Sequence, residues 1–354
     1  LTAQQPLHAS KNIDIDQFLD SHSAYNKYTV NQKGFNATTL AYITPWNRLG
    51  YEVAEIFTHK FNLLAPVWFQ VLGRKKSYTI SGIPNIDKDW IRRVRHQDPA
   101  VKIVPRFIFE EWTAEDYSTT LKDDAKVEHC VANIVRVLND HKFDGAVVEI
   151  WSQFSGVSDK DVITFLRSLA NEIHEAEKML VLVIPPGLYR GGYAGRFTKT
   201  HFEQLYDSVD YFSLMTYDFS SPMDPGANSP IRWVQECIEL LVPERSPKSS
   251  LKRGKILAGL NFYGMLYAED RSSSKPILGH EFVDIVRQSR APLKWVEDSA
   301  EHVLEFRQPN GDKFVVYYPT LLSIAQRLAL FSSLSTGVSI WEIGQGLHSF
   351  YSLF

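Results

Sequence analysis

Acidic and aromatic residues that directly follow short apolar runs are the best candidates for chemistry in this chain. The run Phe143–Trp151, FDGAVVEIW, places Glu149 among apolar neighbours. Side chains of a strand alternate between its two faces, so Val147, Glu149 and Trp151 would share one face. A carboxylate there is costly to bury without a partner. Glu149 is therefore either a satisfied acid of a polar network or part of a ligand site where the strand ends.

Similar residues follow nearly every other apolar run. The set comprises Trp46, Trp68, Glu110, Trp112, Glu149, Trp151, Tyr217, Asp218, Asn261, Tyr263 and Trp341. Aromatic rings cover the C–H faces of sugars, while acids and amides bind hydroxyl groups. The set predicts a saccharide site. The alternative for each single tryptophan is that it fills the core.

Other chemistries have weaker support in the sequence. The chain has no Gly-x-Ser-x-Gly elbow for a serine nucleophile, and its histidines lack the spacing of metal ligands. We expect no metal and no cofactor. Paired acids are an alternative, because Glu149 with Glu110 or Asp218 could form the two-carboxylate arrangement of a glycosidase.

Composition describes an ordinary globular protein. The 354 residues are 44% hydrophobic and 22% charged, with a net charge of −3. Lysine and arginine are dispersed, so no nucleic-acid partner is expected, and no apolar run is long enough to span a bilayer. Cys130 and Cys237 are too few for a disulfide framework. Asn36 begins an N-glycosylation sequon, which favours a secretory route. We expect a secreted or lysosomal protein.

Eight apolar runs, separated by stretches with helical periodicity, give the fold. They are Thr38–Pro45, Leu63–Val71, Val101–Phe109, Gly145–Ile150, Leu180–Ile184, Val209–Tyr217, Lys255–Tyr263 and Gly337–Ile343. Continuous Val/Ile/Leu runs between helices are typical of parallel strands buried on both faces. Eight such units predict an α/β fold, the TIM (β/α)8 barrel. An open doubly wound sheet is disfavoured because no Gly-rich fingerprint follows the first run.

The regular pattern also indicates the domain boundaries. Residues 1–37 are polar and are expected to form an N-terminal extension, and residues 38–354 the barrel. The chain from 265 to 319 is longer than one helix needs and contains Pro309–Asp312, a strong hairpin turn signal. It predicts a small α+β insertion after the seventh strand, beside the barrel mouth.

Several of these motifs resemble those of glycoside hydrolase family 18, the chitinases. Asp144–Trp151 resembles the family's DGxDxDxE strand, Met215–Asp218 its M-x-Y-D, and Trp341 its stacking tryptophan. The phrases PVW, DGAVVEIW, LVIPP, FSLMTYDFS, GLNFYGMLYA and GVSIWEIGQG are similar to those of the stabilin-interacting chitinase-like group. The resemblance runs from about Leu40 to the C-terminus. It implies a TIM barrel, oligosaccharide ligands and an endocytic receptor of the stabilin type as partner.

The chain differs from the family motif at the positions of its acidic residues. In the register of DGxDxDxE, Val147 stands for the second Asp, Glu149 for the third and Trp151 for the catalytic acid. An indole N–H donates a hydrogen bond but no labile proton. Glu149 lies two residues deeper, about 6.6 Å along the strand. The resemblance therefore implies that hydrolysis is lost while the groove is retained, with Trp151 either a wall or a plug of the innermost subsite.

Three functions follow, and we rank the first highest. The first is a non-hydrolytic lectin for N-acetylglucosamine-type or microbial glycans, in which Met215, Tyr217, Asp218 and Trp341 hold the sugar. The second is a glycosidase for another glycan that uses Glu149, Glu110 or Asp218 as its acid. The third is a scaffold whose surface binds a receptor or cargo.

Overall fold

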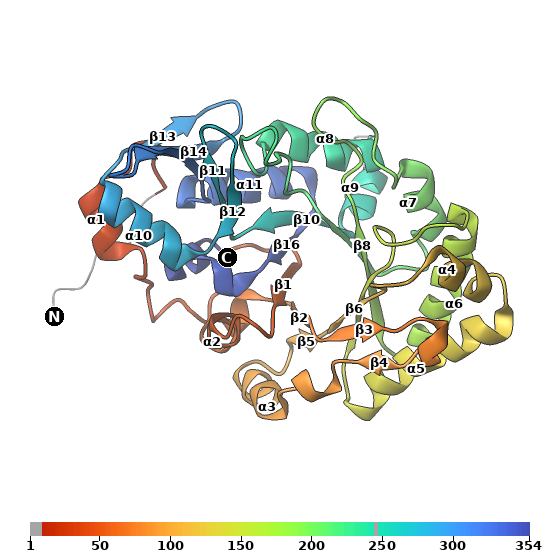
Figure 1. The fold of residues 1–354 in the computed structure, drawn as a ribbon. Coiled ribbons are helices and arrows are strands. Elements are labelled where there is room, and N and C mark those ends of the chain that lie inside the picture. Colours follow the sequence, from red (N-terminus) through yellow and green to blue (C-terminus); the bar gives the residue numbers. More distant parts are fainter. Residues whose placement is uncertain (1–8, 244–246) are drawn as a thin grey trace.

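Eight parallel strands form a closed barrel in the computed structural model, which describes residues 9–243 and 247–354 (Figure 1). They are β1 (Thr39–Ile43), β2 (Leu63–Pro66) continued by β3 (Phe69–Val71), β5 (Lys102–Ile103) continued by β6 (Arg106–Ile108), β7 (Gly145–Glu149), β8 (Met179–Ile184), β9 (Tyr211–Leu214), β10 (Ile256–Asn261) and β16 (Gly337–Trp341). The ring closes because β1 pairs with both β16 and β2, while β2 pairs with β5 and β3 with β6. This confirms the predicted TIM barrel.

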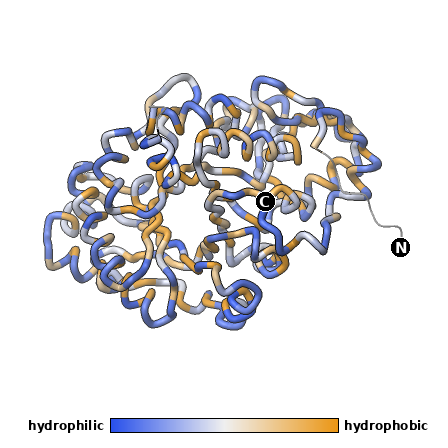
Figure 2. Tube along the Cα trace, turned by 180° about the vertical axis from the view of Figure 1, so that it is seen from behind, coloured by the Kyte–Doolittle hydropathy of each residue, from blue (hydrophilic) through white to orange (hydrophobic). Residues whose placement is uncertain are grey.

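Alternation along the strands divides the core into two layers. On β7, Val147 belongs to the cluster inside the barrel, together with Leu40, Tyr42 and Val181. Ala146 and Val148 point the other way, into the cluster between strands and helices. Hydrophobic segments follow the central strands in Figure 2, as expected for strands buried on both faces. A residue that continues the Val147 row therefore faces the barrel axis.

The barrel helices cover the outside of the strands. They are α2 (Leu49–Ile56), α3 (Lys88–Gln97), α4 (Ala114–Thr120), α5 (Asp124–Asp140), α6 (Asp159–Glu175), α7 (Lys199–Leu205), α8 (Ile231–Leu241), α9 (Pro247–Arg253) and α11 (Leu321–Leu334). α6 shows the sequence logic: Ser158 and Asp161 form a capping box at its start, and a stripe containing Phe165 and Leu169 is buried. Cys130 and Cys237 are free thiols buried in α5 and α8.

Between β10 and α11 the chain forms a small α+β unit. Its elements are β11 (Gly264–Ala268), β12 (Ser274–Ile277), α10 (Gly279–Ser289), β13 (Leu293–Val296), β14 (Glu301–Arg307) and β15 (Lys313–Tyr317). The strands form an antiparallel sheet in the order β12-β11-β15-β14-β13. Between β14 and β15, Gly311 adopts φ +97° at the expected hairpin turn. We call this unit the insertion.

The described part of the N-terminal segment packs on the insertion, more closely than its polar composition suggests. α1 (Ile15–Ser21) is capped by Asp14. The ring of Phe18 lies 5.8 Å from that of Phe282 on α10, and Lys11 Nζ pairs with Glu297 Oε2 at 2.7 Å. Residues 1–8 of the predicted extension lie outside the described residues. None of the described helices combines the length and apolar character needed to cross a membrane.

Candidate functional site

A pocket of about 620 Å³ lies at the carboxyl ends of the barrel strands, beside the insertion. Its lining consists of Arg106, Glu149, Met215, Tyr217, Asp218, Ser220, Ser221, Pro222, Tyr263, Met265, Pro276, Trp341 and Gln345. These residues come from β6, β7, the loop after β9, the turn between β10 and β11, the insertion, β16 and the turn that follows β16. The location is the usual functional face of this fold, and the volume suits a small ligand.

An ion pair between neighbouring strands forms part of the lining. Arg106 Nη1 donates to Glu149 Oε2 at 3.0 Å, and both side chains are only 14% exposed. The guanidinium carbon of Arg106 lies 5.9 Å from the ring centre of Trp341. Glu149 is thus both a satisfied acid and a pocket residue. An acid catalyst must direct a proton toward the substrate, whereas this carboxylate oxygen accepts a hydrogen bond from a cation.

Asp218 is the second pocket acid, and its backbone and side chain are both held. Its backbone N–H donates to Asn228 Oδ1 at 2.6 Å, with Asp218 at φ +59°. Tyr263 Oη donates to Asp218 Oδ1. Burial raises the pKa of the Asp218 carboxyl above its usual value, and the Tyr263 hydrogen bond opposes this rise. Burial also raises the pKa of Tyr263 well above 10, so its hydroxyl stays protonated and donates.

Tyr217 depends on a glycine of the neighbouring strand. A Cβ added to Gly259 on β10 would lie 2.4 Å from the Leu214 carbonyl oxygen and 3.0 Å from the Tyr217 ring. Only glycine allows the end of β9 to approach so closely. Burial raises the pKa of Tyr217 well above 10. Its hydroxyl group is therefore a stable donor in the pocket.

Trp341 ends β16 and is partly exposed in the pocket. Its ring lies 5.1 Å from that of Tyr42, which belongs to the inner core. The next residue, Glu342, points away: its carboxylate accepts from Gly344 N at 2.8 Å and Asn47 Nδ2 at 2.5 Å. Burial raises the pKa of Glu342 to about 7. Trp341 thus offers a supported aromatic surface, whereas Glu342 fixes the loop beneath it.

Trp151 does not reach the pocket, which corrects both expected roles, wall and plug. Its side chain has no exposed surface and packs against Phe154, Phe197 and His201 at ring distances of 5.3, 4.9 and 4.8 Å. The reason is local: β7 ends at Glu149, and the chain then turns, so the alternation of faces no longer applies. The indole joins the outer core.

Two further tryptophans take the core role that was the alternative for each. Trp68 is 3% exposed and donates from Nε1 to Tyr51 Oη at 2.8 Å. Trp112 is 8% exposed and donates from Nε1 to the Val71 carbonyl at 2.7 Å. Both lie in the layer between strands and helices. The prediction that they contact a sugar is therefore wrong.

The other predicted residues divide between the pocket and its surroundings. Trp46 is 71% exposed on the turn after β1, outside the pocket lining. Glu110 is exposed and accepts from Gln70 Nε2 at 2.9 Å. Asn261 is buried and donates to the Tyr263 carbonyl at 2.9 Å. The pocket brings together six of the predicted residues, which are Glu149, Met215, Tyr217, Asp218, Tyr263 and Trp341.

Sequence reasoning missed several lining residues. Arg106 interrupts the apolar run Val101–Phe109, so it carried the same signal that singled out Glu149. Ser220–Pro222, Met265, Pro276 and Gln345 lie in loops and in the insertion and carried no such signal. Across residues 9–243 and 247–354, no group of three or more His, Cys, Asp or Glu side chains is arranged to hold a metal.

Comparison with known proteins relates the barrel to a family. The family model described as glycosyl hydrolases family 18 matches residues 38–346. A chitinase from Chromobacterium violaceum ATCC 12472 superposes with a TM-score of 0.75 at 18% identity, covering 90% of this chain and 97% of that one. A spore cortex-lytic enzyme from Bacillus megaterium QM B1551 gives 0.75 at 16%, covering 91% and 74%. An Ostrinia furnacalis Group IV chitinase gives 0.73 at 14%, covering 90% and 98%. At such identities the likeness shows the shared fold.

Proposed function

The chain belongs to glycosyl hydrolases family 18, and we propose that its pocket binds oligosaccharides of the N-acetylglucosamine type without cleaving them. One observation carries the proposal. The residue in the register of the family's catalytic acid is Trp151, and it is buried outside the pocket. Neither of the two carboxylates among the lining residues stands in that register. Glu149 pairs with Arg106, and Asp218 accepts from Tyr263.

The retained residues suit sugar binding. The partly exposed ring of Trp341 can cover the C–H face of a pyranose. The Tyr217 hydroxyl and the Asp218 carboxyl lie in the same pocket and can bond to the N-acetyl group, the role that matching residues have in the family. Met215 supplies an adaptable apolar contact. Chito-oligosaccharides and related microbial glycans are the ligands that fit this set.

Hydrolysis requires a proton donor at the position of the catalytic acid, and this chain has none there. A proton donor must lie within hydrogen-bond reach of the glycosidic oxygen, and lowering the barrier enough takes many kcal/mol of such assistance. Position 151 supplies an indole that faces Phe197 and His201. The chitinase-like chain is therefore proposed to act as a lectin.

Titration calorimetry of the purified protein with chitotetraose tests the binding half of the proposal. We expect saturable heat with one site per chain. No heat at millimolar sugar, in a sample whose circular dichroism shows a folded barrel, would reject it.

A glycosidase acting on another glycan is the second candidate, favoured by one observation. Burial raises the pKa of Asp218, and a carboxyl with a raised pKa is suited to general acid catalysis. A panel of chromogenic glycosides, with Asp218→Asn as the control, separates the two functions. Turnover that disappears in Asp218→Asn would favour this candidate, and turnover retained in Asp218→Asn would exclude Asp218 as its acid.

We also propose a secreted or lysosomal location and a stabilin-type receptor partner. The receptor comes from the resemblance to the stabilin-interacting group, and the location from that resemblance together with the Asn36 sequon. The exposed side chain of Asn36 is accessible for the glycan that a secretory route would add. A mass decrease on treatment of the secreted protein with a glycan-releasing amidase, absent in Asn36→Gln, would support the route.

A further inference from the structure

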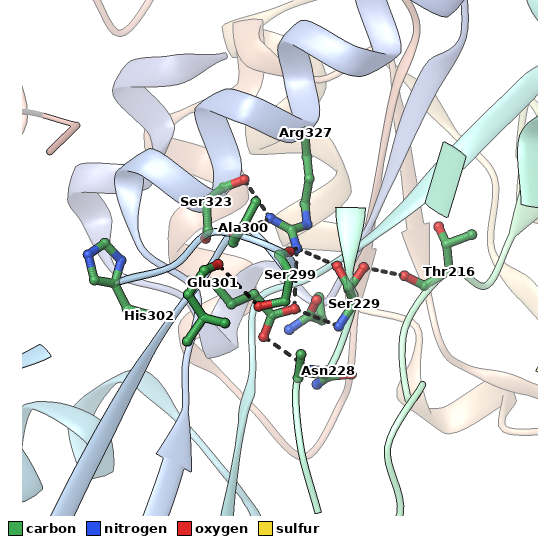
Figure 3. A network of polar contacts seen from close by, with 12 residues as sticks. Thr216, Asn228, Ser229, Ser299, Ala300, Glu301, His302, Ser323 and Arg327 are labelled. Carbon is green, nitrogen blue, oxygen red and sulfur yellow. Dashed lines mark hydrogen bonds and ion pairs between the residues drawn. The ribbon is translucent and has the colours of Figure 1, made fainter. Parts of the chain in front are cut away.

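A buried polar network joins the insertion to the loop that carries the pocket acid Asp218 (Figure 3). Its centre is the ion pair of Glu301, the first residue of β14, with Arg327 on α11, whose Nη2 lies 3.2 Å from Glu301 Oε1. Their side chains are 9% and 3% exposed. A pair buried so deeply is weak evidence for stability, but it can specify one arrangement of the chain.

Both terminal nitrogens of Arg327 donate to acceptors on the two sides of the network. Its Nη1 donates to the carbonyls of Ala300 at 2.9 Å and Ser323 at 2.8 Å. Its Nη2 donates to the carbonyl of Ser299 at 3.1 Å and also to that of Ser229. The guanidinium thus holds the start of β14 against the loop that follows β9. The contacts of Arg327 and the loop thus fix the position of the Glu301 carboxylate.

Glu301 in turn holds the backbone of that loop. Its Oε1 accepts from Ser229 N at 2.7 Å, and its Oε2 accepts from Asn228 N at 3.1 Å. Ser229 Oγ donates to the Thr216 carbonyl at 2.6 Å, directly before Tyr217. Both carboxylate oxygens are therefore used to fix two consecutive residues of the pocket loop.

Asn228 connects Glu301 to the pocket residue Asp218. Its Oδ1 accepts the Asp218 N–H at 2.6 Å, and its carbonyl accepts the Phe219 N–H at 2.9 Å. Asp218 occupies the left-handed region at φ +59°, a conformation that few non-glycine residues adopt without support. The chain of contacts runs from Glu301 through Asn228 to Asp218.

We propose that Glu301 is a positioning residue of the saccharide pocket, which acts through Asn228 on Asp218 and couples the insertion to sugar affinity. Glu301 is absent from the lining of the pocket. The claim about sugar affinity rests on the proposed lectin function. The claim that Glu301 fixes the backbone of Asp218 and Phe219 is tested separately, by amide hydrogen exchange.

The experiment compares four variants of the full chain. Glu301→Gln removes the charge and one of two acceptors, and Asn228→Ala leaves the ion pair intact but removes the acceptor of the Asp218 N–H. Glu305→Gln, on the same strand and in an exposed pair with Lys294, is the matched control. Leu138→Ala, in the fully buried core of α5, controls for lost stability alone. Each is measured by amide hydrogen exchange and by calorimetry with chitotetraose.

We expect faster exchange at the Asp218 amide in both Glu301→Gln and Asn228→Ala, faster exchange at the Phe219 amide in Glu301→Gln, and unchanged exchange at both amides in the two controls. Chitotetraose affinity should fall roughly 3- to 30-fold in the first two variants, the usual range for coupling through a packed network. If Glu301→Gln does not fold, Glu301→Asp, which keeps the charge but shortens the side chain, takes its place. Faster exchange in a protein that binds no sugar would reject the lectin function and support the positioning role. Unchanged exchange in the first two variants, or an equal affinity loss in Leu138→Ala, would overturn it.

Discussion

At the scale of single residues, the central feature is where the indole of Trp151 lies. The sequence is enough to show that the residue in the register of the catalytic acid cannot donate a proton. It cannot show that β7 ends two residues earlier and that the side chain turns into the outer core. An indole in the pocket would have narrowed it; an indole in the core leaves the pocket open above Trp341.

Trp151→Glu is predicted to lower stability without creating a chitinase. The new carboxylate would be buried among Phe154, Phe197 and His201, away from the pocket. We expect a loss of roughly 2–4 kcal/mol in the free energy of unfolding, measured in urea. Trp151→Phe, which keeps the apolar contact, should lose less. Release of chromophore from a chitobioside by Trp151→Glu would contradict this account.

Trp341→Ala is predicted to weaken chitotetraose binding by roughly 1–3 kcal/mol, because a supported aromatic surface in the pocket is lost. Trp46→Ala removes an aromatic ring that is more exposed but lies outside the lining. Calorimetry on both folded variants makes the comparison. Equal losses, or a loss confined to Trp46→Ala, would move the site toward the turn after β1.

At the scale of elements, Glu342 joins the end of β16 to the turn after β1 through Asn47. Burial raises the pKa of Glu342 from 4.5 to about 7. The folded state then binds a proton that the unfolded state has released. The contribution of this residue to stability is fully present below pH 4.5 and is lost as the pH rises to about 7.

Glu342→Gln removes this titration and is predicted to flatten the pH dependence of stability. The difference between variant and parent should change by roughly 3 kcal/mol between pH 4.5 and 7.5. Chemical denaturation at several pH values measures it. The exposed Glu305→Gln should keep the parental slope. A parental slope in Glu342→Gln as well would show that the carboxyl titrates normally.

The barrel strands were predictable from the sequence because their composition alone distinguishes them. All eight strands could be located because runs such as Leu180–Ile184 are continuously apolar, as parallel strands buried on both faces must be. Interruptions within a strand or helix depend on single residues, and the periodicity does not reveal them. The third strand divides at Pro105, which has no N–H to donate. Residues 114–139 have helical periodicity throughout, yet they divide into α4 and α5, because Asp123 caps a new start.

At the scale of the whole molecule, the pocket is assembled from segments far apart in the chain. Arg106 and Trp341 come from two strands, Tyr217 from the loop after β9, and Met265 and Pro276 from the insertion. Spacing along the sequence cannot give distances across a barrel mouth. The strand ends pointed to Tyr217, Asp218 and Trp341, the resemblance to the family added Met215, and periodicity predicted the barrel that holds them. Trp68 and Trp112 were predicted to line the pocket because they follow strands. A side chain at the end of a strand can point either into the pocket or into the outer core, and the sequence does not show which.

The most direct test of the account is incubation of chitohexaose with the pure protein, followed by mass spectrometry of the sugar, with binding measured in parallel. The account predicts saturable binding and an intact hexamer after prolonged incubation. Dimers, trimers or tetramers that accumulate in proportion to protein, and that vanish in the Asp218→Asn variant, would contradict it.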